Sequence, residues 1–539
     1  MKIKRVCIVG GGSSGWMTAA ALTKLCPNID VTLVESPDIK TVGVGESTLG
    51  HINRFMRLLG LKDKEWMPAC QATYKNSIRF TNFRENDGSH FEYPFVDDYD
   101  LSLAGEEELK TWTELSALYP DIFGPQTFAE FFAMSNTLLA THNRQTYNTK
   151  NELRYFNFAY DTAYHFDATA FGIYLRDNIC IPGGVRHIKA EVKAHKHDDK
   201  GTIHSILLLG GHDVGADLFI DCTGFRSVLL GGWQGVPFHS FKDILANDSA
   251  WAVRLPYTDR KKQIHNVTDC HAIENGWVWN IPLWNLIGTG YVYSSKFVYR
   301  EDALKEFKTH LQSKHKVDVE NADYFHIDIK HGKRLRAWLG NVVGIGLSYG
   351  FVEPLESTGL LTTHENIIDL CHILNQRGGY VTRTEKEIFN FTVNHAIDSF
   401  ATFVSSHYGL SMRTDTSYWR WATQKNEYDP ELHGLFTIKN DHWVNSMATV
   451  IGNNAFNPSM QGMNFIMAGM GIRPVSSEAM FLARHGKTGH AESRRKQLEH
   501  IKDKFLSERD KFTKHIKSLP SHYEFLKENI YGGIDEHDV

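Results

Sequence analysis

The segment at residues 350–359, GFVEPLESTG, places two carboxylates, Glu353 and Glu356, beside a run of small polar residues. Pro354 ends regular secondary structure, and Ser-Thr-Gly favours the start of a helix, where backbone N–H groups point outward without intrahelical partners. Such N–H groups attract an anion, whereas a carboxylate attracts a cation or accepts a proton. The segment therefore combines N–H groups that could bind an anion with a carboxylate that could bind a cation or a proton. Of the two carboxylates, Glu353 is more simply explained by a structural role.

A lysine is the second candidate reactive group. Lys75 comes just before the alternating run SIRF at residues 77–80, which predicts a strand. A buried lysine can donate a hydrogen bond or act as a nucleophile when its surroundings tune its protonation state. From the residues alone, a surface lysine that starts a strand is the simpler interpretation.

The elements that must position these groups begin at the N-terminus. Residues 4–36 predict a strand, a turn, an apolar helix and a second strand, with Gly10, Gly12 and Gly15 in a G-x-G-x-x-G pattern and Glu35 at the end of the second strand. The glycines allow a tight turn, the helix start binds a pyrophosphate, and the acid binds ribose hydroxyls. This combination predicts a bound dinucleotide and argues against NADP.

Composition narrows the class of protein. The chain has 539 residues, enough for more than one domain, and a net charge of −5, which gives no reason to expect a nucleic-acid partner. Its seven cysteines form no C-x-x-C pair, which favours a reducing compartment and a cytoplasmic location. We expect no signal peptide, no membrane-spanning segment and no metal site.

Two later segments point to the kind of dinucleotide. ADLFIDCTGFRS, at residues 216–227, is an apolar strand that ends in Asp-x-Thr-Gly, and it resembles the segment that returns to the nucleotide in FAD-dependent monooxygenases. Residues 340–359 resemble the third FAD segment of the same proteins. Each segment alone is also explained as an ordinary sheet strand. Together they predict a discontinuous FAD-binding domain.

Two more patterns complete a resemblance to a known family. A G-E-S-T loop occupies residues 45–48, and Trp277, Trp279, Ile281 and Pro282 form W-x-W-x-I-P. With Lys75 and P-L-E-S-T-G, they make the chain similar to flavin-dependent halogenases of the tryptophan-halogenase type over about residues 1–370. The resemblance implies an α/β fold (α+β overall), with an FAD-binding Rossmann-like box of monooxygenase type and a mostly helical substrate-capping domain. Residues 1–100, 155–300 and 335–375 would form the first, and 100–154 and 376–539 the second.

The family resemblance also implies an activity and roles for residues. Members use reduced FAD, O2 and a halide ion to form hypohalous acid, which halogenates an electron-rich aromatic molecule. Lys75 and Glu356 match the catalytic residues, and Trp277 and Trp279 match a pair that separates the flavin from the substrate. Ordinary core packing on a strand is the alternative for the two tryptophans. The halide would be bound at Ser357, Thr358 and Gly359. The FAD would be bound by Gly10, Gly12, Ser13, Ser14, Gly15, Glu35, Val44, Glu46, Val192, Leu347 and Leu360.

The substrate is expected to differ from free tryptophan. Tyr93-Pro94-Phe95 stands where the family's tryptophan enzymes have His-Pro-Phe, and residues 450–471 lack the tyrosines and the acid that bind the amino-acid backbone there. The resemblance then implies a wider, polarisable pocket for indoles or phenols; ordinary core positions are the alternative for these residues. Its wall would include Phe95, Phe456, Met460, Met463, Phe465 and Met467. Because bromide and iodide are easier to oxidise than chloride, they are the favoured halides.

The absence of a second nucleotide fingerprint implies that a separate flavin reductase supplies FADH2. The sequence leaves the oligomeric state undecided, and a homo-oligomer is one of the possible states. Three alternatives are an aromatic hydroxylase on the same scaffold, a flavin-binding protein without catalysis, and a halogenase whose substrate is tethered to a carrier protein.

Overall fold

The computed structural model describes residues 1–38, 45–96, 98–315, 317–424, 459–472 and 489–532. The chain forms two compact units. The first contains Met1–Ala72, His165–Lys242 and Ile329–Ala401, and the second contains Thr73–Tyr164, Asp243–Asp328 and Thr402–Val539. Residues 73–100 and 243–300, which we expected in the FAD-binding domain, therefore belong to the second unit.

The first unit is built on a six-stranded sheet in the order β20-β21-β12-β1-β2-β8. Five strands are parallel, and β20 pairs antiparallel at one edge. The central strands are short apolar runs, as is typical of a parallel sheet covered on both faces. The strands are β1 (Arg5–Val9), β2 (Asp30–Glu35), β8 (Arg186–Lys189), β12 (Leu218–Asp221), β20 (Trp338–Leu339) and β21 (Val342–Gly344).

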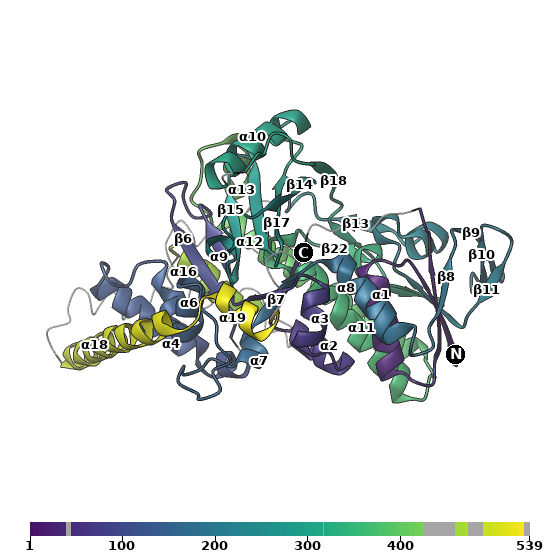
Figure 1. The fold of residues 1–539 in the computed structure, drawn as a ribbon, viewed down its shortest axis with the longest axis horizontal. Coiled ribbons are helices and arrows are strands. Elements are labelled where there is room, and N and C mark those ends of the chain that lie inside the picture. Colours follow the sequence, from purple (N-terminus) through teal and green to yellow (C-terminus); the bar gives the residue numbers. More distant parts are fainter. Residues whose placement is uncertain (39–44, 97, 316, 425–458, 473–488, 533–539) are drawn as a thin grey trace. The chain divides into compact units, whose positions relative to one another are not determined.

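Helices and two small sheets complete the first unit. The helix α1 (Ser13–Leu25) follows β1 directly and packs against α8 (Ala168–Leu175) and α11 (Thr358–Gln376), as Figure 1 shows. An apolar cluster joins Val9 and Phe219 of the large sheet to Ile206 and Val214 of a small neighbouring sheet. The small sheets consist of β9 (Val192–His197), β10 (Ile203–Leu208) and β11 (Asp213–Gly215), and of β13 (Phe238–Ser240), β19 (Gly332–Arg334) and β22 (Gly350–Phe351).

The second unit contains a seven-stranded sheet in the order β18-β14-β17-β16-β15-β5-β6. All neighbours are antiparallel except β15 and β5. One face carries Val278 and Tyr291, which pack on Phe307 and Leu311 of α10 (Arg300–Lys314). The strands are β5 (Ser77–Thr81), β6 (His90–Pro94), β14 (Ser249–Pro256), β15 (Val267–Ala272), β16 (Gly276–Pro282), β17 (Leu286–Tyr293) and β18 (Phe325–Asp328).

Helices make up most of the rest of the second unit. The long C-terminal helix α18 (Gly489–Ser518) buries Leu498 and Phe505 in a cluster with Trp112 and Phe128. Arg494 of α18 also forms an ion pair with Glu114 at 2.6 Å. Its other helices include α4 (Asp98–Leu118), α5 (Thr127–Phe132), α6 (Met134–Thr141), α13 (Ser417–Gln424), α16 (Ser459–Gly469) and α19 (His522–Asn529), and several appear in Figure 1. The helix α12 (Arg383–Gly409) begins in the first unit and ends in the second.

The mixed α/β class and the first strand–helix–strand unit are confirmed. All seven cysteines are buried and unpaired. Among the described residues, no helix has the length and apolar character needed to cross a membrane, and no cluster of His, Cys, Asp or Glu has metal-binding geometry.

Candidate active site

In the first unit, the predicted nucleotide segments meet beyond the carboxyl ends of β1 and β12. Gly10 has φ +113°, and a Cβ there would lie 2.2 Å from the backbone oxygen of Cys222. The Gly10 N–H donates to Val34 O at 2.8 Å, and the Cys222 N–H donates to Val9 O at 2.8 Å. Only glycine fits at this turn, because any side chain would collide with the neighbouring backbone.

The start of α1 is open to an anion. Its N-cap is Gly12, which has no side chain to cap the helix, and its first turn contains no acidic residue. A Cβ on Gly346 would lie 2.4 Å from Ser14 Oγ, so the turn at Gly346–Ser348 lies directly against the helix start. Partial positive charge and unpaired N–H groups at such a helix start suit a pyrophosphate.

Glu35 is held in place beside the glycine turn. Its Oε1 lies 2.7 Å from Nε2 of His187 on β8, and its Oε2 is so close to Gly11 that a Cβ there would lie 1.6 Å away. The His187 ring packs edge-on against Trp16, with ring centroids 5.0 Å apart. The cradle, the open helix start and the fixed carboxylate together fit the ADP half of FAD.

Asp221, in the Asp-x-Thr-Gly segment, has a structural role. Its carboxylate accepts hydrogen bonds from the backbone N–H groups of Thr223, Leu229 and Leu230 and from the Thr223 hydroxyl, at 2.6–3.0 Å. Burial raises the pKa of Asp221, although these bonds favour its charged form. The backbone oxygen of Asp221 also accepts hydrogen bonds from Ile345 N at 3.0 Å and from Ser348 Oγ. Asp221 thus ties together the second and third predicted FAD segments.

The remaining predicted FAD residues are more scattered. Glu46 opens β3 (Glu46–Ser47), which pairs with Phe166 of β7 (Ala163–Phe166), and burial together with repulsion from Asp167 raises the pKa of Glu46 to about 7. Val192 lies in the apolar cluster beside the large sheet. Leu347 is 37% exposed and Leu360 is buried, and the side chain of Ser13 donates to Ala168 O at 3.4 Å. Val44 lies outside the described residues.

The predicted halide segment forms the start of α11. Ser357 adopts a left-handed conformation, φ 56° and ψ 28°, between a single turn at Pro354–Glu356 and the helix. Its N–H donates to Pro354 O at 3.0 Å, and its hydroxyl donates to Ser47 Oγ at 3.0 Å. Thr358 Oγ1 is buried and has no hydrogen-bond partner in the described part of the chain. A Cβ on Gly359 would lie 3.3 Å from the ring of Phe351.

Both carboxylates of the opening segment are completely removed from solvent. Glu353 and Glu356 each have 0% exposed surface. Because burial of a carboxylate is costly unless it has polar neighbours, both positions are constrained by their surroundings.

In the second unit, Lys75 is the last residue of β4 (Thr73–Lys75), and it too has 0% exposed surface. Its ammonium lies 5.0 Å from the centroid of the Phe95 ring, in cation–π geometry. The structure therefore excludes the interpretation of Lys75 as a surface lysine. It also brings together two predicted site residues, one catalytic and one on the substrate side.

Trp277 and Trp279 lie on the face of β16 opposite to Val278, which packs under α10. Their ring centroids are 6.2 Å apart at 59°. The Trp279 ring covers Gly290 of β17, where a Cβ would lie 2.2 Å from the ring. Trp279 Nε1 is buried without a hydrogen-bond partner among the residues described here.

The expected Met-rich wall is partly ordinary core. Phe465 packs in the apolar cluster with Trp112, and its ring centroid lies 5.6 Å from that of Tyr93. Met463 and Met467 are buried. Phe456 and the side chain of Met460 lie outside the described residues.

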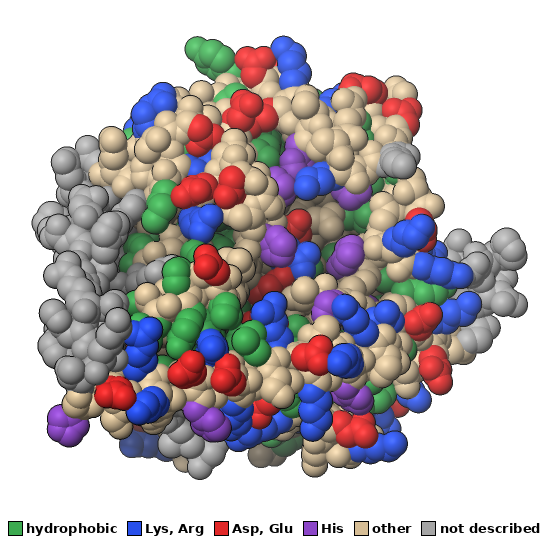
Figure 2. All heavy atoms as spheres, turned by 90° about the vertical axis from the view of Figure 1, so that its left-hand side faces the viewer, with side chains coloured by type: hydrophobic (Ala, Val, Ile, Leu, Met, Phe, Trp, Pro, Cys, Tyr) green, Lys and Arg blue, Asp and Glu red, His purple; other side chains and the backbone are tan. Residues whose placement is uncertain are grey.

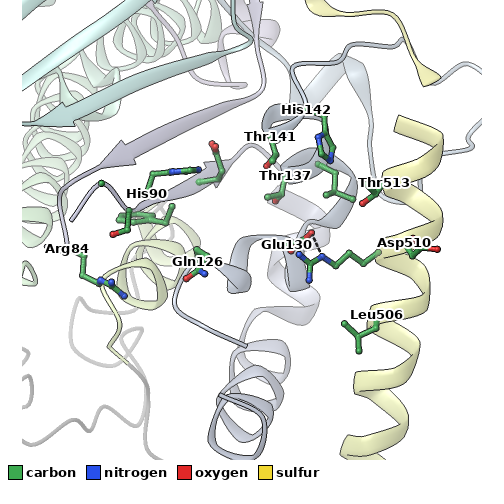
Figure 3. Close-up of a pocket in the computed structure, with 16 residues that line it drawn as sticks. Arg84, His90, Gln126, Glu130, Thr137, Thr141, His142, Leu506, Asp510 and Thr513 are labelled. Carbon is green, nitrogen blue, oxygen red and sulfur yellow. Dashed lines mark ion pairs between the residues drawn. The ribbon is translucent and has the colours of Figure 1, made fainter. Parts of the chain in front are cut away.

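A surface cavity of ≈ 880 Å³ is a separate feature of the second unit (Figure 3). It is lined by β6, α5, α6 and α18, and it contains an ion pair between Glu130 and Arg509 at 2.9 Å. Figure 2 shows acidic, basic and histidine side chains mixed over the face of the molecule that it draws. None of the described site residues predicted from the sequence lines this cavity, so it is not the predicted active site.

Sequence reasoning missed several residues that hold the predicted ones. His187 orients Glu35, and three buried amides, Asn76, Asn136 and Gln145, surround the Lys75–Phe95 contact. Asn76 adjoins Lys75 in the sequence, which was a usable signal. Asn136 and Gln145 belong to no motif, and each lies 60 or more residues after Lys75 in the sequence.

Comparison with known proteins assigns the family. A family model described as tryptophan halogenase matches residues 5–485. The chain belongs to this family. Among curated relatives of the halogenase, the 7-chloro-L-tryptophan 6-halogenase KtzR of Kutzneria sp. (strain 744) is 33% identical, over 96% of this chain and 98% of its own.

Solved structures agree with the assignment. The apo structure of a protein named VirX1 matches the halogenase with a TM-score of 0.88 and 52% identity, over 98% of this chain and 100% of its own. Xcc4156, a flavin-dependent halogenase from Xanthomonas campestris, matches with a TM-score of 0.81 and 29% identity, over 98% of each chain. The halogenase is therefore a flavin-dependent enzyme of the oxidoreductase type with the family's FAD-binding fold.

Proposed function

We propose that the halogenase attaches a halogen to an electron-rich, indole-like or phenol-like small molecule other than free tryptophan, and that it uses bromide or iodide more readily than chloride. The observation that carries this proposal is the complete burial of Lys75 with its ammonium on the face of Phe95. A buried lysine beside an aromatic wall suits a reaction between a polar oxidant and an aromatic ring. Free tryptophan is disfavoured because residues 450–471 contain neither tyrosine nor an acid.

The first unit would bind FAD and halide. Reduced FAD, once bound, supplies with O2 the oxidising power that converts halide into hypohalous acid. Gly10, Gly12 and Gly15 leave room for the pyrophosphate at the start of α1, and Glu35 binds the ribose. Because the Ser357 N–H already donates to Pro354 O, the groups proposed to donate to the halide are the Thr358 and Gly359 N–H groups and the Thr358 hydroxyl.

The second unit would direct the halogen to the substrate. Lys75 either donates a hydrogen bond to the oxygen of hypohalous acid or carries the halogen on its own nitrogen. Phe95 stacks on the aromatic substrate. The ring carbon that accepts the halogen must then lose its proton, and the resemblance to the family assigns the role of base to Glu356, a residue of the first unit.

The partners and location follow from chemistry rather than from a bound ligand. The N-terminal fingerprint is the single nucleotide-binding pattern that we find in the sequence, so a separate flavin reductase is proposed to deliver FADH2. Seven unpaired, buried cysteines support a reducing compartment, which we propose to be the cytoplasm.

The test is mass spectrometry of reactions that contain the purified halogenase, FAD, a flavin reductase with NADH, air, bromide and a set of free indoles and phenols. We expect a brominated product, recognised by its paired isotope signal. In Lys75→Ala the product should fall by about 10²–10⁴-fold, because a group that acts on the reacting atoms is removed.

The control is Lys333→Ala, since Lys333 is another buried lysine and forms an ion pair with Asp398 in the first unit. This variant should lose stability but keep its product yield per folded protein. A hydroxylated product would instead establish the hydroxylase alternative. Bound flavin without product from free aromatics, but with product from a thioester-linked aromatic, would establish a carrier-tethered substrate.

A further inference from the structure

A set of buried side-chain amides surrounds the contact between Lys75 and Phe95. Asn76, Asn136 and Gln145 are each at most 1% exposed. Three buried amides within one short region need an explanation, because each must find hydrogen-bond partners away from water. Asn136 donates to the carbonyl of Phe95, and Asn76, the residue after Lys75, pairs with Gln145.

The backbone of Phe95 is held on both sides. Its N–H donates to Asn76 O at 3.1 Å, and its carbonyl accepts a hydrogen bond from Asn136 Nδ2 of α6 at 2.5 Å. Phe95 follows the last residue of β6, so the regular pairing with β5 ends here. With both backbone groups fixed, the ring of Phe95 keeps only its side-chain rotations.

Asn76 is in turn fixed by a reciprocal amide pair. Its Nδ2 donates to Gln145 Oε1 at 2.7 Å, and Gln145 Nε2 donates to Asn76 Oδ1 at 3.3 Å. The Asn76 N–H donates to Asn266 O at 2.7 Å. Asn76 separates β4 from β5 and directly follows Lys75, so this pair fixes the point where the chain passes Lys75.

We propose that Asn136, with Asn76 and Gln145 behind it, is a positioning residue that holds the Phe95 ring against the Lys75 ammonium and thereby decides which atom of the aromatic substrate lies within reach of the halogen. This inference rests on the proposed function of Lys75 and Phe95. The amides touch Phe95 and the backbone beside Lys75 rather than the reacting atoms. Hydrogen bonds have fixed directions, so they define the ring position more sharply than apolar packing does.

The consequence is a separation of two steps. Formation of hypohalous acid depends on FAD, O2 and halide, and none of the hydrogen bonds given above for the three amides involves a residue proposed to bind them. Transfer of the halogen to the ring depends on geometry at Lys75, where a misplacement of about 1 Å costs up to about 10²-fold in rate. Loss of the Asn136 bond should therefore impair the second step and spare the first.

The test compares Asn136→Leu with Phe95→Leu and with the control Asn247→Leu. Leucine keeps the size of asparagine but cannot donate to the Phe95 carbonyl. Asn247 is an equally buried amide of the same unit, and its Nδ2 donates to the Tyr408 hydroxyl at 3.1 Å rather than to the Phe95 carbonyl. Three quantities are measured: halogenated product per hypohalous acid formed, the ratio of positional isomers, and aromatic-substrate affinity of the FAD-free protein by calorimetry.

We expect Asn136→Leu to lower product per hypohalous acid about 10- to 100-fold, to change the isomer ratio and to weaken substrate binding. Phe95→Leu should shift all three quantities in the same direction, and the double variant should add little to either single change. Asn247→Leu should lower only the melting temperature. If Asn136→Leu behaves like Asn247→Leu, with isomer ratio and affinity unchanged, the proposal is wrong.

A second variant covers the case in which Asn136→Leu does not fold. Gln145→Met keeps the side-chain shape and removes the pair with Asn76, one step further from Phe95. It should give a smaller change of isomer ratio and affinity in the same direction, and unchanged values would overturn the proposal. A wild-type halogenase that yields no halogenated product would contradict the proposed function, whereas the calorimetric comparison would still decide whether the amides position Phe95.

Discussion

The two units hold their candidate reactive groups by different means. In the first unit the proposed binding groups are backbone N–H groups at the starts of α1 and α11, next to glycines and to the left-handed residue Ser357. In the second unit the proposed reactive group is the side chain of Lys75, which lies over the ring of Phe95, and the carbonyl of Phe95 is held by the amide of Asn136 from a distant part of the chain. A backbone site tolerates almost any change except a new side chain, whereas a side-chain site is sensitive to the loss of single hydrogen bonds.

This contrast suits the proposed division of labour. The cofactor is the same in every cycle, so a rigid backbone cradle would suit it. The aromatic substrate is what differs between enzymes, and a site built from side chains can be altered one residue at a time. The following predictions test the contrast at each unit.

The largest effect is expected at the glycine cradle. Gly10→Ala places a Cβ 2.2 Å from Cys222 O at a φ of +113°, so FAD affinity should fall by about 100-fold or more, measured by flavin fluorescence. The matched control is Gly60→Ala. Gly60 also has a positive φ, +72°, but its Cβ would meet nothing within 4 Å. It should cost about 1 kcal/mol of stability and leave FAD binding intact. Equal loss of FAD binding in both variants would show that the cradle is not specific.

A smaller effect is expected from pH at Glu46. Its pKa is raised from 4.5 to about 7, so between these pH values the folded protein binds a proton that the unfolded chain releases. The contribution of Glu46 to the free energy of unfolding therefore decreases as the pH rises from about 4.5 to about 7, and the folded protein becomes less stable. Glu46→Gln removes this loss and should stabilise the FAD-free protein by about 1–3 kcal/mol at pH 8, with little effect at pH 4.5.

Urea denaturation at both pH values measures this difference. The companion variant is Asp167→Asn, which keeps the N-cap bond to Ala170 but removes the repulsion that helps to raise the pKa of Glu46. It should move the pH window of the Glu46 effect downward. A difference between wild type and Glu46→Gln that does not change with pH would contradict the raised pKa of Glu46.

The smallest effect is expected at the halide cradle. Thr358→Val removes a buried hydroxyl that lacks a hydrogen-bond partner in the described structure, and it keeps the shape of the side chain. If that hydroxyl contributes to halide binding, the halide concentration for half-maximal rate should rise by roughly 3- to 10-fold, the worth of one hydrogen bond to an anion. Thr358→Ser should stay near wild type. If the halide dependence is unchanged in both variants, the Thr358 hydroxyl does not bind the halide, and only backbone N–H groups remain as proposed donors.

The first unit was largely predictable from the sequence because its geometry is local. The spacing of Gly10, Gly12 and Gly15 between a strand and a helix already implies the turn, and Glu35 follows from the length of the helix. The segment at Asp221 was recognised as well, but its role was not. Asp221 orders the turn that follows it, which depends on N–H groups that come into place only after folding.

The second unit was less predictable because its contacts are not local. Lys75 and Phe95 were each selected, yet nothing in their spacing implied that they touch, and Asn136 and Gln145 gave no signal at all. The boundaries of the units also differed from expectation, since a strand such as β16 carries the same alternating pattern whichever unit contains it. Apolar periodicity could not separate Phe465, a core residue, from a pocket wall.

The most direct test of the account is to measure, in one reaction, the hypohalous acid captured by a chemical trap and the halogenated aromatic product, for the wild type and for Lys75→Ala. The account predicts that Lys75→Ala still forms hypohalous acid at close to the wild-type rate while the aromatic product disappears. Loss of both together would place Lys75 in the formation of the oxidant. Retention of the aromatic product would contradict the assignment of Lys75 as the residue that directs the halogen to the substrate.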